Sequence, residues 1–180
     1  MSHIVILSGP SGAGKSSVAE ALAQRYDRTV HFETDLLFRA VRMGYVHPMQ
    51  PESDRQNRMI ARAAARAASA FAQDLFAVFI DGVIGPHLLP IYVDELTVVA
   101  VPVHFVLLLP TVEESIRRVA PRAPERKMIE AEHRELHRQF AEHGEFGGCI
   151  IDNTGMMADE TADLVMEACG RGGCLVYFPV

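Results

Sequence analysis

The sequence predicts an α/β protein in which helices cover both faces of a parallel β-sheet. Short apolar segments alternate along the chain with longer segments of helical periodicity, and strands joined by helices of this length run parallel. Residues 103–109 form an apolar run that ends at Pro110, as expected of a strand buried on both faces. A glycine-rich loop at residues 9–16 separates the first strand from the first helix.

The remaining elements follow in order along the chain. Strands are expected at residues 3–7, 29–32, 76–80, 103–109 and 149–151, and residues 175–178 could add a further one. Helices are expected at residues 16–26, about 36–44, 53–73, 112–119, 124–142 and 159–169. Ser53 is the expected N-cap of the longest helix, with Gln56 at the capping-box position. The apolar face of that helix is expected to consist of Ile60, Ala64, Ala67 and Phe71.

Length and composition limit the class of protein. A chain of 180 residues suffices for one domain with a core, so residues 1–180 are expected to form a single domain. The net charge of −6 argues against a broad nucleic-acid-binding surface. The longest apolar stretch, residues 98–109, falls far short of the roughly 18 residues of a membrane span. The first residues lack the basic region of a signal peptide, which favours a cytoplasmic protein.

The spacing of the three cysteines does not indicate a metal site. Cys149, Cys169 and Cys174 lack metal-ligand spacing, and we expect them to be small buried residues with free thiols in a reducing compartment. His133 and His137 lie four residues apart on an expected helix, but the charged residues around them favour a solvated helix face over a zinc site.

The glycine-rich loop carries the most specific motif of the chain. Its sequence fits the pattern G-x-x-x-x-G-K-[ST] and lies between a strand and a helix, the context that this motif requires. Such a loop turns its N–H groups toward phosphate oxygens at a helix N-terminus. Lys15 can reach the β- and γ-phosphates, and the Ser16 hydroxyl can ligate Mg²⁺. The residues expected to contact ATP are Gly9, Ser11, Gly12, Ala13, Gly14, Lys15, Ser16 and Ser17.

This loop, the strand spacing and the short length resemble the P-loop kinases that phosphorylate small molecules and nucleotides. The chain is most similar to shikimate-kinase-like, gluconate-kinase-like and chloramphenicol-phosphotransferase-like enzymes. The resemblance implies a three-layer P-loop fold whose five-stranded parallel sheet has the order 2-3-1-4-5. It also implies a small arginine-bearing lid at about residues 117–127, and ATP with Mg²⁺ as cofactors.

Carboxylates follow two of the expected strands. In the kinases that this chain resembles, an acidic pair after the second strand serves the acceptor hydroxyl and the waters of Mg²⁺, and Glu33 and Asp35 match that pair. Asp35 would accept the proton of the hydroxyl, and the alternative is that it only caps the following helix. Asp81 ends the third strand as a Walker-B-like carboxylate that helps to hold Mg²⁺.

The segment after Asp81 bears on the acceptor. Nucleotide kinases often carry Asp-Gly-Phe-Pro-Arg at this place, whereas this chain reads Asp81-Gly82-Val83-Ile84-Gly85. The absent Pro-Arg disfavours a nucleotide acceptor, and Gly82 would let a substrate approach the backbone.

Arginines supply the remaining candidates. By resemblance, Arg118 would lie against the adenine and Arg122 would contact the transferring phosphates, while Arg117 and Arg126 could share these roles. Arg39 and Arg42 follow Asp35 closely and are candidates to border the acceptor pocket. A stripe on the longest helix is interpreted mainly as a solvated face; it consists of Arg55, Arg58, Arg62 and Arg66. By position, residues 152–155 would flank the adenine.

The leading hypothesis is therefore an enzyme that transfers the γ-phosphoryl group of ATP to a hydroxyl of a small molecule. One alternative is a nucleotide-binding ATPase or switch without an acceptor. The sequence lacks the Asn-Lys-x-Asp motif of a GTP switch, and motor proteins of the AAA type are generally longer. Another alternative is a nucleoside or nucleotide kinase. The expected partners are ATP and a small hydroxyl-bearing substrate, without membrane or nucleic acid, and the oligomeric state is left open.

Overall fold

The computed structural model describes residues 2–121, 129–142 and 148–178, and it contains a six-stranded sheet. The strands are β1 (Ile4–Ser8), β2 (Thr29–Glu33), β3 (Ala77–Asp81), β4 (Val103–Leu108), β5 (Cys149–Ile151) and β6 (Leu175–Tyr177). The five strands β2-β3-β1-β4-β5 pair in parallel in this order, which confirms the order expected from the resemblance. The tail adds β6, which pairs antiparallel with the beginning of β4.

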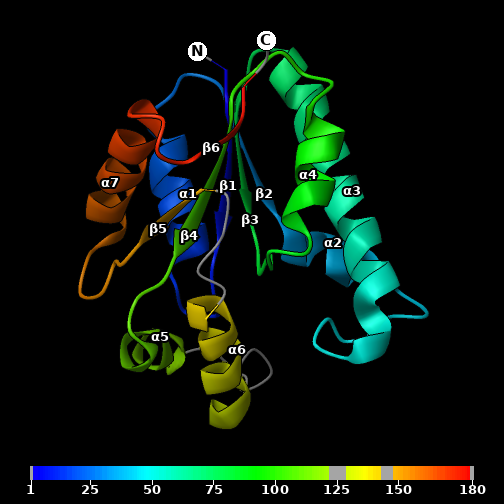
Figure 1. Ribbon diagram of the computed structural model, residues 1–180, viewed down its shortest axis with the longest axis vertical. Coiled ribbons are helices and arrows are strands. Elements are labelled where there is room, and N and C mark those ends of the chain that lie inside the picture. Colours follow the sequence, from blue (N-terminus) through cyan, green and yellow to red (C-terminus); the bar gives the residue numbers. More distant parts are fainter. Residues whose placement is uncertain (1, 122–128, 143–147, 179–180) are drawn as a thin grey trace.

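Helices lie on both faces of the sheet and beyond its carboxyl end (Figure 1). Two of them, α1 (Lys15–Ala23) and α7 (Ala158–Gly170), cover one face, and α3 (Asp54–Gln73) and α4 (Leu89–Leu96) cover the other. The short helix α2 (Thr34–Ala40) follows β2 directly, and a single 3₁₀ turn, Pro51–Ser53, leads into α3. The helices α5 (Val112–Val119) and α6 (Glu130–Glu142) lie below the carboxyl ends of the strands in Figure 1.

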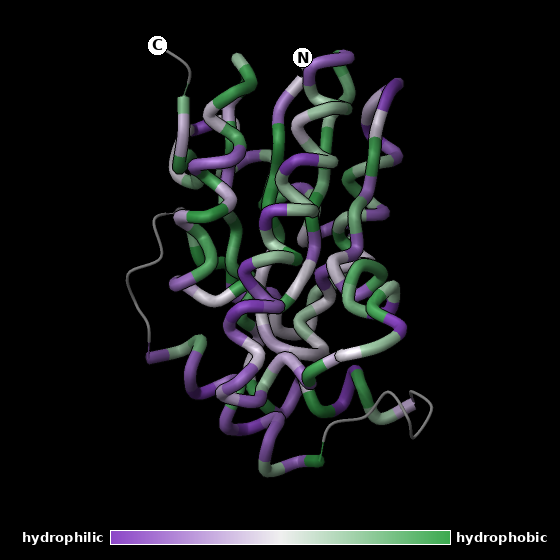
Figure 2. Tube along the Cα trace, turned by 90° about the vertical axis from the view of Figure 1, so that its right-hand side faces the viewer, coloured by the Kyte–Doolittle hydropathy of each residue, from purple (hydrophilic) through white to green (hydrophobic). Residues whose placement is uncertain are grey.

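Two apolar layers hold the helices to the sheet, because successive side chains of a strand point to opposite faces. Ile4 and Ile6 of β1 belong to the layer under α3 and α4, whereas Val5 and Leu7 belong to the layer under α1 and α7. Figure 2 shows the apolar strands inside and the polar segments outside. The resulting three layers are the fold that the sequence predicts.

Three local expectations for the helices need correction. The sequence analysis missed α4, a short and largely apolar helix with Pro90 in its first turn. Ser53 occupies the N-cap position of α3 as expected, but its side chain does not cap the helix and donates instead to the carbonyls of Pro48 and Gln50. Gln56 does not complete a capping box either, since its amide bonds to both backbone groups of Val46.

The buried face of α3 is also rotated from the expected one. Ile60 and Ala64 are buried as expected, but Phe71 is 40% exposed and Ala67 is only partly buried. The helix packs through its small residues instead; these are Ala61, Ala65, Ala68, Ser69 and Ala72. Small side chains let α3 approach α4 and the sheet closely, which the sequence pattern of large residues could not indicate.

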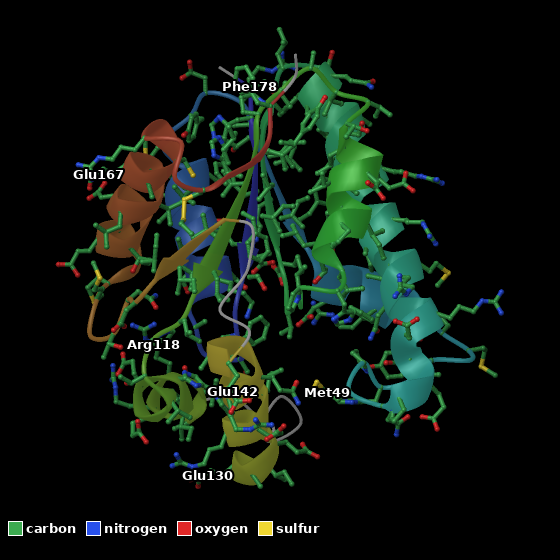
Figure 3. All side chains as sticks on the ribbon, viewed as in Figure 1. Met49, Arg118, Glu130, Glu142, Glu167 and Phe178 are labelled. Carbon is green, nitrogen blue, oxygen red and sulfur yellow. A yellow bond between two sulfur atoms is a disulfide. The ribbon has the colours of Figure 1, made fainter. Side chains whose placement is uncertain are left out.

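The expectation of three free thiols is wrong for two of the cysteines. Cys149 at the start of β5 and Cys174 before β6 form a disulfide, seen as a yellow bond in Figure 3. It joins two segments that flank α7, at a sequence separation of 25. Cys169 remains free and partly buried, and burial raises the pKa of its thiol to about 12.

None of the described helices is long and apolar enough to cross a membrane.

Candidate active site

The phosphate-binding motif forms the turn between β1 and α1, at the carboxyl end of the sheet. Backbone geometry requires glycine there. Gly9 has φ +145°, and a Cβ on it would lie 2.3 Å from the carbonyl oxygen of Leu108. Gly12 has φ +79°, and its Cβ would lie 2.2 Å from the carbonyl oxygen of Ser115. Gly14, with φ 92°, is the N-cap of α1, a left-handed conformation that side chains rarely adopt.

The Lys15 side chain lies over the same loop. Its ammonium group donates to the carbonyl oxygens of Gly9 and Pro10, both at 2.9 Å. These bonds hold one positive charge at the N-terminus of α1, where the partial charge of the helix already favours an anion. The loop therefore offers the geometry and the charge of a phosphate site.

The side chain of Asp81 connects the loop to the end of β3. It is 3% exposed, and its Oδ2 accepts a 2.5 Å hydrogen bond from the Ser16 hydroxyl. Its Oδ1 lies 3.4 Å from Nε2 of His31, on β2. Burial lowers the pKa of His31, but the negative charges of Asp81, Glu33 and Glu20 outweigh this effect and leave the pKa raised. The sequence analysis did not identify His31, although its position two residues before Glu33 placed both on one face of β2.

The pair of oxygens from Ser16 and Asp81 fits Mg²⁺. The ion prefers hard oxygen ligands and is usually held by one or two carboxylates together with substrate phosphates. The described residues contain no group of three His, Cys, Asp or Glu side chains that could hold a metal by themselves. A metal here would therefore need ligands from phosphate or water as well as from the chain.

The remaining candidate carboxylates lie at the end of β2. Glu33 pairs in register with Asp81 across the sheet, so the two expected metal-site carboxylates end neighbouring strands. Asp35 is exposed in the first turn of α2, and the N-cap of this helix is Glu33. The alternative in which Asp35 only caps the helix is therefore wrong, because Asp35 lies inside it.

A close contact fixes where α2 starts. Thr34 is buried beside Gly82, and a Cβ on Gly82 would lie 2.2 Å from Oγ1 of Thr34. Gly82 thus serves the packing of β3 against α2. This contact by itself accounts for the glycine, and the approach of a substrate to its backbone stays a prediction.

The two arginines after Asp35 differ in their surroundings. Arg39 lies 4.0 Å from Glu33, so it borders the carboxylates at the strand ends. Arg42 is exposed in the segment that follows α2. Large apolar side chains are also exposed in this part of the chain; they are Leu36, Met43, Tyr45 and Met49. Met49 is labelled in Figure 3 and lies on the side of its loop that faces α6.

Arg118 lies on the other side of the phosphate loop (Figure 3). Its guanidinium donates to the carbonyl oxygens of Asn153 at 2.8 Å, Met156 at 3.1 Å and Ala13 at 3.4 Å. Asn153 is almost fully buried and donates its amide to Ala13 at 3.0 Å. The loop after β5, which was expected beside the adenine, therefore touches both the phosphate loop and Arg118.

Glu114 orients Arg118 and was not anticipated from the sequence. Its carboxylate accepts hydrogen bonds from Arg117 at 2.7 and 2.8 Å and from Arg118 at 2.8 Å. The bond with Arg117, followed by that with Arg118, lowers the pKa of Glu114 to about 2. Arg122 and Arg126, expected in the lid, lie outside the described residues.

The arginines of α3 match the expected solvated face, whereas the two histidines of α6 do not. Arg62 and Arg66 contact Glu95 of α4, at 3.7 and 2.8 Å, and Arg58 contacts Asp54 at 2.8 Å. The stripe on α3 is thus a charged outer face. The helix bearing His133 and His137 is less solvated than expected: His133 is buried, and Nε2 of His137 lies 2.7 Å from the carbonyl oxygen of Pro110.

Comparison with known protein families gives one match. Residues 4–146 match the family described as the AAA domain. The chain belongs to this family. The matched segment contains the phosphate loop, Asp81 and α5. A comparison with curated proteins found no match.

Solved structures with the same fold cover nearly the whole chain. The tunicamycin resistance protein of Deinococcus radiodurans has a TM-score of 0.71 at 18% identity, covering 98% of this chain and 99% of that one. Shikimate kinase from Acinetobacter baumannii, in complex with shikimate, has a TM-score of 0.64 at 18% identity, with 96% and 95% covered. The APS kinase CysC of Mycobacterium tuberculosis, in complex with AMPPNP and APS, has a TM-score of 0.66 at 16% identity, with 94% and 98% covered. The fold is that of the P-loop kinases that act on small molecules, as the sequence resemblance indicated.

Proposed function

We propose that this protein transfers the γ-phosphoryl group of ATP to a hydroxyl group of a small molecule. The observation that carries the proposal is the bond between Ser16 and Asp81, which joins the phosphate loop to a strand end whose register partner is Glu33, with Asp35 two residues further along the chain. A nucleotide-binding loop alone needs no carboxylate after β2. Among the solved structures of this fold, the shikimate kinase holds shikimate and the APS kinase holds both AMPPNP and APS. These complexes support a site with one part for the nucleotide and another for a small acceptor.

Each candidate residue has a role in this proposal. The loop residues and Lys15 would bind the phosphates, Ser16 and Asp81 would hold Mg²⁺, and Glu33 would bond to its water ligands. When bound, Mg²⁺ would neutralise charge on the phosphate oxygens. Arg118 lies against the adenine, and Arg122 contacts the transferring phosphate. Arg42 and Arg39 border the acceptor, beside Gly82.

The chain's own chemical step is a proton transfer. The acceptor oxygen attacks the γ-phosphorus and forms a bond to it, while the bond from the γ-phosphorus to the oxygen that bridges the β- and γ-phosphates breaks. Asp35 accepts the proton that leaves the hydroxyl, and ADP leaves with the electron pair of the broken bond. The exposed position of Asp35 in the first turn of α2 leaves its carboxylate open to an incoming alcohol.

The segment after Asp35 guides the choice of acceptors. It exposes Leu36, Met43 and Tyr45, with Met43 90% exposed, and it also contains Arg42. A screen should therefore include alcohols with apolar or aromatic groups beside sugars and sugar acids. We expect the protein to act in the cytoplasm, where ATP is supplied.

The test measures ADP release from ATP and Mg²⁺ over a panel of hydroxyl compounds, with mass spectrometry of the product. Asp35→Asn should leave ATP affinity nearly unchanged and lower phosphoryl transfer by about two to four orders of magnitude. Asp74→Asn is the control, because this exposed aspartate precedes β3 at the opposite end of the sheet.

The AAA domain match favours a second candidate, a nucleotide-binding ATPase module without an acceptor. It predicts ADP release that no hydroxyl compound accelerates. It also predicts that Asp35→Asn has no effect on hydrolysis. Acceptor-independent hydrolysis in both the wild-type protein and the variant would replace the kinase proposal with this one.

A further inference from the structure

The side chain of His31 is a polar group at the site for which the proposed reaction has no use. It projects from β2 on the sheet face that α1 covers, because its register partner Phe79 belongs to that apolar layer. The side chain is 16% exposed, and Nε2 has no aligned hydrogen-bond partner among the described residues. A buried imidazole nitrogen without a hydrogen-bond partner costs free energy. The presence of a histidine at a strand position that would suit an apolar residue therefore needs an explanation.

The carboxylate of Asp81 supplies that reason. Nε2 lies 3.4 Å from Oδ1, only slightly beyond a well-formed hydrogen bond, and a small rotation of either side chain would close the gap. Nε2 must carry the proton, since two acceptors facing each other would repel. The other carboxylate oxygen, Oδ2, is already bonded to Ser16. The carboxylate of Asp81 therefore has a polar group beside each oxygen, Ser16 of α1 at Oδ2 and His31 of β2 at Oδ1.

We propose that His31 is a positioning residue of the magnesium site, which holds Oδ1 of Asp81 so that Oδ2 stays directed at Ser16. The inference rests on the proposed nucleotide site. Groups that orient a metal-site carboxylate through a hydrogen bond typically change metal affinity by about 10- to 100-fold when they are removed. The role of His31 is thus to strengthen metal-dependent binding, without contact to the nucleotide.

The experiment measures ATP affinity by calorimetry, once with EDTA and once with saturating Mg²⁺. The ratio of the two dissociation constants reports the metal alone. In His31→Val this ratio should fall about tenfold, while affinity in EDTA stays unchanged. In His31→Gln the ratio should be largely restored, because the amide N–H reaches about as far as Nε2–H. His31→Asn, whose amide is too short to reach, should behave like the valine variant.

His104→Val is the matched control. His104 is another buried histidine of the same sheet, paired with Val5 near the amino end of β1, and it should leave the ratio unchanged. Thermal melting checks the fold of each variant. If the valine variant does not fold, the asparagine and glutamine variants carry the comparison, since both keep a polar side chain.

The outcomes separate the inference from the proposed function. If the ATP affinity of the wild-type protein does not respond to Mg²⁺, the proposed magnesium site is wrong, and the inference about His31 is wrong with it. A wild-type response that survives unchanged in both His31→Val and His31→Asn would overturn the inference and leave the proposed function intact. Equal losses of ATP affinity in EDTA and in Mg²⁺ for the His31 variants would overturn the inference and assign His31 a structural role only.

Discussion

Asp81 shows how single residues tie distant parts of the chain together. Its carboxylate is nearly inaccessible, yet it contacts Ser16 of α1 and His31 of β2. The sequence identified Asp81 and Ser16, because an aspartate that ends an apolar strand and a serine that ends the glycine loop are local patterns. His31 was not identified, because its partner lies fifty residues along the chain and only strand pairing brings them together.

Lys15 should be required for nucleotide binding but not for folding. Its ammonium group donates to the loop carbonyls of Gly9 and Pro10, so Lys15→Ala should abolish detectable ATP binding with little change in melting temperature. Calorimetry with ATP and Mg²⁺ measures this. Arg25→Ala serves as the control, because Arg25 follows α1 and contacts Asp163 of α7 instead. Undiminished binding by the alanine variant at position 15 would refute the phosphate site.

Glu114 should contribute to stability in a pH-dependent way. Because Arg117 and Arg118 lower its folded-state pKa from 4.5 to about 2, its stabilising effect is full above the unfolded pKa and is lost as pH falls from about 4.5 toward 2. Glu114→Gln should therefore lose part of the difference in unfolding free energy between pH 6 and pH 3. Urea unfolding at both pH values measures it, with Glu167→Gln on the exposed face of α7 as the control. The same acid dependence in the Glu114 variant and in the wild type would contradict the assignment.

At the scale of elements, the site depends on how strand ends are held together. The Ser8 hydroxyl, at the end of β1, donates to the carbonyl of Ile84 at 2.8 Å and accepts from its N–H at 3.1 Å. The segment after β3 is thus fixed to the strand that precedes the phosphate loop. The sequence predicts where these strands end, but the hydrogen bonds between their ends depend on the order of strands in the sheet.

The contact between Thr34 and Gly82 gives a test at this scale. Gly82→Ala would place a methyl group 2.2 Å from Oγ1 of Thr34, and overpacking of this kind costs about 1–3 kcal/mol. Thr34→Ala removes the clashing oxygen, so the double variant should regain much of the lost stability. Denaturant unfolding of the wild type, both single variants and the double variant measures the coupling. Strictly additive effects of the two substitutions on the unfolding free energy would show that Thr34 and Gly82 are not coupled through this contact.

The whole molecule is a sheet between two helical layers, closed at one edge by a disulfide. Cys149 and Cys174 enclose α7, and loss of a disulfide that spans this many residues typically costs about 2–4 kcal/mol. Reduction, or Cys149→Ser with Cys174→Ser, should lower the unfolding free energy by that amount. Urea unfolding with and without reductant measures it, and Cys169→Ser is the control because this thiol is free. Equal stability of oxidised and reduced protein would show that the sheet and α7 hold this edge without the bond.

The sequence by itself determined the parts that depend on local order. These are the alternation of strands and helices, the phosphate loop with its glycines, and the carboxylates that end β2 and β3. The resemblance added the strand order, which the structure confirms. The alternation, the loop and the two carboxylates follow from neighbouring residues, whose spacing is fixed by the geometry of a helix, a strand or a turn.

Tertiary structure decided what depends on residues far apart in the chain. It paired Cys149 with Cys174, rotated α3 onto its alanines, and placed Glu114 and Asn153 around Arg118. It also brought His31 to Asp81. The physical reason is that packing and hydrogen bonding act through distance in space, and the parallel crossovers bring together strand ends that the chain separates by tens of residues.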